Sequence, residues 1–145
     1  MRRSRTDLRL PSALVAAFHD AYSRTGAAAR EMMARLLADE ASRNETRGAL
    51  FAGLTDPIPQ IRGTCALLLL QSGEPAQPQL LRALLGTFAS PDAETGRGAR
   101  ELVASLLADE ASREQTSEVL ACALNDDAPS VRRTCEELLQ TLGRA

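Results

Sequence analysis

The chain has 145 residues, of which 44% are hydrophobic and 25% are charged, and its formal net charge is −2 at pH 7. These values are ordinary for a globular protein, and they give no electrostatic reason to expect binding to nucleic acid or to an anionic membrane. The length is sufficient for one domain with a sizeable core. All seventeen basic residues are arginine, which we attribute to the codon usage of a GC-rich bacterium.

The chain contains a tandem duplication. The octapeptide LLADEASR at 36–43 recurs letter for letter at 106–113, an offset of 70 positions, and the similarity extends without a gap over most of both halves. Self-similarity at a fixed period is typical of stacked repeats. We therefore predict one repeat domain over residues 11–143, preceded by a basic N-terminal tail at 1–10.

Hydrophobic periodicity predicts eight helices in four antiparallel pairs. In chain order, the first helix of each pair lies at 11–22, 43–54, 78–88 and 113–124. The second helix carries an apolar stripe at positions i, i+4, i+7 and i+8, which starts in turn at Ala29, Ile61, Ala99 and Val131. The four pairs define repeats at approximately 11–41, 42–73, 77–111 and 112–143, two in each 70-residue unit.

Turn and cap signals agree with these helix boundaries. Ser42 and Ser112 are each followed three residues later by Glu or Gln, which predicts capping boxes at two helix N-termini. Gly73 and Gly143 lie where a left-handed C-cap is expected. Duplication together with a capping role for Ser42 explains the repeated octapeptide, and a doubled docking patch is the alternative.

The second and fourth repeats share a longer pattern. Leu54-x-Asp56-x-x-Pro59-x-Ile61-Arg62 is matched by Leu124-x-Asp126-x-x-Pro129-x-Val131-Arg132. This pattern resembles that of the HEAT repeat family. The resemblance implies a right-handed α-solenoid of about four HEAT-like helical hairpins, used mainly for protein–protein contact. It also implies that four residues form a structural ladder between repeats: Asp56, Arg62, Asp126 and Arg132.

The residue types give no sign of catalysis or metal binding. A nucleophilic mechanism that needs a histidine must use His19, the only one in the chain, and we interpret it as a solvated or capping residue. Cys65, Cys122 and Cys135 lack metal-ligand spacing, and we interpret them as small, buried hydrophobic residues. We therefore expect no catalytic residue, no metal site and no cofactor.

A partner is expected on the concave face, which the second helix of each pair lines in a solenoid. Residues away from the buried stripes are predicted to face it: Glu31, Arg35, Gly63, Leu67, Leu70, Glu101, Arg133 and Glu137. The helix at 61–70 is apolar nearly all round, since Leu67 and Leu70 lie opposite its stripe. Leu67 and Leu70 either pack within the molecule or form an exposed apolar patch for the partner.

The sequence thus favours a non-enzymatic scaffold or adaptor of the bacterial cytoplasm that binds a segment of another protein. A nucleic-acid- or anion-binding HEAT-like module and an accessory subunit of a HEAT-like lyase are the alternatives. No run of residues is apolar and long enough for a membrane span. The chain is expected to end without a polar capping helix, which would allow self-association through the solenoid ends.

Overall fold

A computed structural model describes residues 5–19, 24–89 and 93–143 of the chain. Within these ranges the protein is all-helical, as predicted, and no residue lies in a β-strand. The helices of the described ranges are α1 (Arg5–Ala16), α2 (Arg24–Ala38), α3 (Arg43–Gly53), α4 (Pro59–Gln71), α5 (Pro78–Leu84), α6 (Ala93–Ala108), α7 (Glu110–Cys122) and α8 (Pro129–Gly143). Short 3-10 segments, η1 (Ala17–His19), η2 (Leu85–Ala89) and η3 (Ala123–Asn125), follow α1, α5 and α7. Because α1 begins at Arg5, the second half of the predicted tail is helical.

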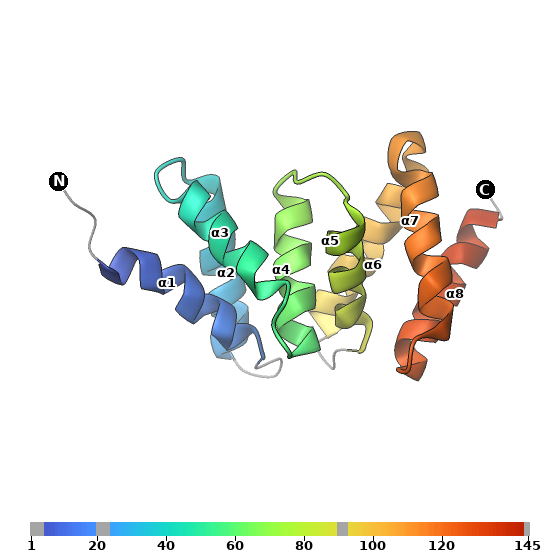
Figure 1. Ribbon diagram of the computed structural model, residues 1–145, viewed down its shortest axis with the longest axis horizontal. Coiled ribbons are helices and arrows are strands. Elements are labelled where there is room, and N and C mark those ends of the chain that lie inside the picture. The colour runs from blue at the N-terminus through green and yellow to red at the C-terminus, as the bar shows by residue number, and fades with distance from the viewer. Residues whose placement is uncertain (1–4, 20–23, 90–92, 144–145) are drawn as a thin grey trace.

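The two halves of the chain share most of their helix–helix contacts. In the first half α3 packs on α1, α2 and α4, and α2 also packs on η1 and α4. In the second half α7 packs on α5, α6 and α8, and α6 also packs on η2 and α8. The helices follow one another along the long axis of the molecule, with α1 and α8 at opposite ends (Figure 1). The duplication in the sequence therefore corresponds to a duplication in the packing.

Helix α4 joins the two halves. It packs on α3 of its own half and on α5, η2 and α6 of the other, and it lies in the middle of the molecule (Figure 1). Every residue from Gly63 to Leu70 is buried. Leu67 and Leu70 are 5% and 8% exposed, so the prediction that they form an exposed patch is wrong, and the alternative of intramolecular packing holds. The reason is that the second half of the chain covers the face of α4 opposite its own stripe.

Helix α8 is the counterpart of α4, and no helix among the described residues covers the corresponding face. The positions equivalent to Gly63, Ala66, Leu67 and Leu70 are occupied by Arg133, Glu136, Glu137 and Gln140, all exposed. These four positions of α8 therefore form a polar face, unlike their apolar counterparts on α4, and self-association through the ends of the array stays a prediction.

The boundaries of α4 follow from its sequence. Pro59 is the first residue of the helix, where its missing N–H is not needed. At the other end Gly73 has a φ of +107°, and its N–H bonds to the carbonyl of Leu70 while the N–H of Glu74 bonds to that of Leu69. This pair of bonds is a Schellman motif, so the C-cap predicted for Gly73 is confirmed. The counterpart, Gly143, is the last residue described, and its cap lies outside the described residues.

Candidate functional site

The repeated octapeptide closes a helix C-terminus in each half. The Ser42 hydroxyl donates to the carbonyl of Leu36 at 2.8 Å, and Ser112 does the same to Leu106 at 2.7 Å. Ser42 precedes α3 but makes no side-chain bond to its N-terminus, and Asp109, not Ser112, is the N-cap of α7. The predicted capping boxes are therefore wrong, because both hydroxyls turn back to the end of the preceding helix.

The arginine that ends the octapeptide completes this closure. Arg43 donates from Nε to the carbonyl of Leu37 at 2.9 Å and from Nη2 to that of Ala38 at 3.3 Å. Arg113 makes the same two bonds, 2.8 and 3.1 Å long. Carbonyls in the last turn of a helix lack an intrahelical partner, and a cation there also faces the negative end of the helix dipole. The identity of the two copies thus has a structural cause.

The arginines of the HEAT-like pattern hold loops within single repeats. Arg62 donates from Nη1 to the carbonyls of Asp56 and Pro57, at 2.8 and 3.0 Å. Arg132 makes the equivalent bonds at 2.6 and 3.1 Å. The carboxylates of Asp56 and Asp126 instead accept a backbone N–H two residues later. These residues are structural, as expected, but their contacts lie inside a repeat and do not form the ladder between repeats that the resemblance implied.

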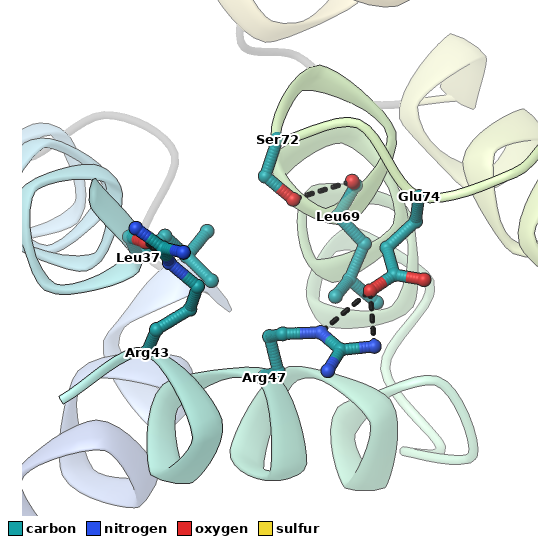
Figure 2. A network of polar contacts seen from close by, with 6 residues as sticks. All are labelled: Leu37, Arg43, Arg47, Leu69, Ser72 and Glu74. Carbon is teal, nitrogen blue, oxygen red and sulfur yellow. Dashed lines mark hydrogen bonds and ion pairs between the residues drawn. The ribbon is translucent and has the colours of Figure 1, made fainter. Parts of the chain in front are cut away.

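One ion pair has no equivalent in the second half. Arg47 on α3 donates through Nε and Nη2 to Oε1 of Glu74, which follows the Schellman turn of α4 (Figure 2). The Glu74 side chain is only 15% exposed. The Arg47 guanidinium also lies 5.9 Å from the centre of the Phe51 ring, within range of a cation–π contact. The pair fastens the 72–77 connection to α3, and no local sequence pattern indicates it because 27 residues separate the partners.

Two adjoining hollows lie on the side of the molecule that α2 and α4 share. The first, of about 660 Å³, is bounded by the end of α2, by Arg43 and Arg47 of α3, and by the end of α4. The second, of about 440 Å³, lies between α2, α4 and α6. Both are lined by Ala34, Leu68 and Gln71, so the two hollows adjoin along these residues, and we call them together the α2–α4–α6 groove.

The α2–α4–α6 groove has an apolar floor and charged walls of both signs. Leu67 and Leu68 of α4 lie in its floor next to Gly98 of α6, where a Cβ atom would be 3.7 Å from Cδ2 of Leu67. Its walls carry charged side chains from α2 and α6: Arg30, Glu31, Arg97 and Glu101. A small residue at 98 therefore keeps the floor open between the two flanking helices.

The structure brings only part of the predicted partner surface together. Glu31, Leu67 and Glu101 line the α2–α4–α6 groove. Gly63 and Leu70 are buried beneath the second half. The remaining predicted residues, Arg35, Arg133 and Glu137, are exposed but line neither hollow. Helical periodicity places residues on faces of one helix, and it does not show which faces of neighbouring helices meet.

The cysteines divide into two buried and one exposed. Burial, with a smaller effect of Asp56, raises the pKa of the Cys65 thiol to about 12. Burial, with a smaller effect of Asp126, raises the pKa of the Cys135 thiol to about 11. Cys122 is exposed, which corrects the interpretation of all three as buried hydrophobic residues. The side chain of His19 lies outside the described residues.

Among the described residues, no three His, Cys, Asp or Glu side chains are grouped so that they could hold a metal ion. No helix in the described ranges is both long and apolar enough to cross a membrane. No family model, no curated protein and no solved structure matches the chain. The α2–α4–α6 groove, which is built from the two adjoining hollows, is the candidate site.

Proposed function

We propose that the protein is a non-enzymatic binding module, a HEAT-like right-handed α-solenoid that holds a segment of another protein in the α2–α4–α6 groove. The observation that carries the proposal is that two hollows lie end to end along α2 and α4 and share Ala34, Leu68 and Gln71. A peptide segment needs an elongated furrow of this kind, whereas a small ligand needs a single enclosed cavity. The resemblance of the Asp-x-x-Pro-x-Ile-Arg pattern to HEAT repeats supports the same class of function.

The chemistry of the α2–α4–α6 groove suits a peptide with apolar anchors and mixed charges. An apolar floor with a polar rim is the usual arrangement of a protein-binding patch. Arg30 and Arg97 line this groove together with Glu31 and Glu101, so charge complementarity favours a segment that carries both signs. A nucleic acid would instead need a surface of one sign to contact successive phosphates.

The test is a random-peptide display selection with matched variants of the groove. Ala34 is exposed and lines both hollows, so Ala34→Trp fills the furrow without disturbing the core. Its counterpart after 70 residues, Ala104, is also exposed but lines neither hollow. We expect selected peptides to bind the wild-type protein and Ala104→Trp with equal affinity. Their affinity for Ala34→Trp should be lower by a factor of about ten or more.

A second pair of variants acts on the floor of the groove. Gly98→Ala adds a Cβ that meets only ordinary contacts, with Leu67 at 3.7 Å and Gln71 at 4.0 Å, and peptide binding should persist. Gly98→Phe places a ring in the furrow and should block binding. Peptides that bind Ala34→Trp and Gly98→Phe with the same affinity as the wild-type protein would contradict the proposal. Salt-dependent retention of duplex DNA, tested in parallel, would support the nucleic-acid alternative.

A further inference from the structure

The duplication supplies an internal reference for a second surface, at the N-terminal end of the molecule. In the second half, α5, η2 and α6 are covered by α4. The equivalent elements of the first half are α1, η1 and α2, and they come first in the row of helices (Figure 1). No helix precedes α1 among the described residues. The residues of the covered surface therefore show which side chains pack against a covering helix, and their counterparts in the first half can be compared with them.

The covered surface is closely packed. A Cβ built on Gly63 of α4 would lie 2.5 Å from Cγ2 of Thr87, 2.8 Å from its backbone N and 3.3 Å from the carbonyl oxygen of Ala83. Leu80, at the other end of the same stripe of α5, is 1% exposed. On α6, Gly98 lies against Leu67. The covering helix therefore presents glycine, alanine and two leucines, at 63, 66, 67 and 70.

The same positions in the first half are apolar, and all but one of them are exposed. Subtracting 70 from Leu80, Ala83, Thr87, Gly98 and Leu102 gives Leu10, Ala13, Ala17, Ala28 and Met32. We call these five residues the N-terminal face. Leu10 is 44% and Met32 40% exposed, and they are two of the four large hydrophobic residues that the fold leaves exposed among those described. Ala13 and Ala28 are also exposed, and Ala17 is half-buried.

The composition of the N-terminal face matches the requirement of a covering helix. Residues 10, 13 and 17 fall on one side of the first helix of the pair, and 28 and 32 lie one turn apart on α2. All five are uncharged, and the three alanines permit close approach of a helix backbone. Ala17 lacks the Cγ2 that makes Thr87 the tightest neighbour of Gly63. The face is also distinct from the α2–α4–α6 groove, which uses other residues of α2.

A second copy of the chain does not supply the covering helix. Its α4 is already buried. Its α8, the only helix equivalent to α4, would place Arg133, Glu136, Glu137 and Gln140 where the template has Gly63, Ala66, Leu67 and Leu70. Burying these polar groups against alanine and leucine costs free energy without a compensating partner. Head-to-tail assembly of the wild-type chain is therefore disfavoured by its own C-terminal helix.

We propose that the N-terminal face is a docking site for an apolar helix of a different protein, one that presents small and leucine side chains in the spacing of Gly63, Ala66, Leu67 and Leu70. This helix occupies the position that α4 holds over the second half. Ala16 stands where the second half has Gly86, whose Cβ would lie 2.6 Å from the carbonyl oxygen of Pro59. The first turn of the docked helix therefore lies further from the surface than that of α4.

The first experiment uses a helical peptide that copies the contact face of α4. It keeps the residues at 63, 66, 67 and 70, carries glutamine at the four positions of the buried stripe, and is stapled on that polar side. A control peptide carries the α8 residues Arg, Glu, Glu and Gln at the four contact positions. We expect the first peptide to bind the wild-type protein in a fluorescence anisotropy titration. The affinity of the control peptide should be lower by a factor of about ten or more.

Protein variants locate the binding. Ala13→Arg puts a charge at the centre of the N-terminal face and should weaken the α4-type peptide by about tenfold or more. Ala52→Arg, at an exposed alanine of α3, is the matched control and should leave binding unchanged, as should Ala34→Trp in the groove. Equal binding of both peptides, insensitivity to Ala13→Arg, or a dimer of the wild-type chain that Ala13→Arg disrupts would each overturn the proposal.

The second experiment moves the template to the other end of the chain. Replacing Arg133, Glu136, Glu137 and Gln140 by Gly, Ala, Leu and Leu gives α8 the contact face of α4. This variant should form head-to-tail oligomers in sedimentation velocity, and adding Ala13→Arg should return it to the state of the wild-type protein. A folded variant that does not oligomerise would also overturn the proposal. If circular dichroism shows that it does not fold, the peptide titration decides.

Discussion

The close approach of α4 to η2 gives one substitution opposite effects at two sites. Replacing a helical glycine by alanine stabilises an exposed site by about 1 kcal/mol. Gly48 of α3 is such a site, since a Cβ there meets nothing within 4 Å. At Gly63 the new Cβ falls 2.5 Å from Cγ2 and 2.8 Å from the backbone N of Thr87. Overpacking of this kind costs about 1–3 kcal/mol, and the upper end applies because a backbone atom cannot rotate away.

The net effect of Gly63→Ala is thus a loss of about 2 kcal/mol, the difference between overpacking and helix propensity. For a chain of this length each kcal/mol shifts the melting temperature by about 3–4 °C. Gly63→Ala should therefore lower it by about 6–8 °C, and Gly48→Ala should raise it by about 3–4 °C.

Thermal unfolding followed by circular dichroism measures both shifts in the same buffer. Thr87→Ser removes Cγ2 but keeps the hydroxyl bond to the carbonyl of Leu84, 2.8 Å long, so the double variant Gly63→Ala/Thr87→Ser should recover part of the loss. Equal stabilisation by Gly63→Ala and Gly48→Ala would refute the reasoning, because it would mean that α4 and η2 are not in close contact.

Three further predictions concern single side chains. Arg62→Ala should lower the free energy of unfolding in urea by about 1–2 kcal/mol, since two charge-assisted bonds to loop carbonyls are lost. Leu67→Glu should cost more than about 3 kcal/mol in the same assay because it buries an unpaired charge, whereas a destabilisation as small as that of Glu137→Leu on α8 would contradict the burial of Leu67. At pH 8 a thiol reagent should modify Cys122 rapidly and the two buried cysteines only after denaturation. Burial raises the pKa of these two thiols from 9.0 to about 12 and 11, so as the pH rises the unfolded chain loses these protons before the folded protein does. The free energy of unfolding should therefore fall as the pH rises above about 9, and the urea midpoint between pH 8 and 11 measures this fall.

The helices could be predicted from the sequence because they depend on short-range patterns. The stripes starting at Ala29 and Ile61 mark α2 and α4, and Gly73 marks the end of α4 through its left-handed backbone. The role of Ser42 could not be predicted in this way. Its neighbours match a capping box, but the connection from α2 to α3 is short enough that the hydroxyl reaches the carbonyl of Leu36.

The candidate groove could be predicted only in part because it depends on which helix faces meet. Leu67 and Leu70 stand out in the sequence as the unusual residues of α4, but periodicity leaves open whether they face solvent or α5 and α6. A comparison of the α4 sequence with that of α8 indicates that they are buried. The side chains at these positions are apolar in α4 and polar in α8, which distinguishes an internal helix from a terminal one. The Arg47–Glu74 pair has no such internal counterpart to compare.

The position of α4 between the two halves also affects how cooperatively the molecule folds. The first half ends in a helix whose far side is apolar, and the second half begins with the surface that this side covers. Neither half alone buries this hydrophobic surface. A chain cleaved in the connection after Glu74 would therefore yield two fragments that are stable only when they associate. In a linear array the energy of the junction between neighbours determines whether they unfold together. Here that junction is buried and tightly packed, so we expect the two duplicated units to unfold as a single cooperative body.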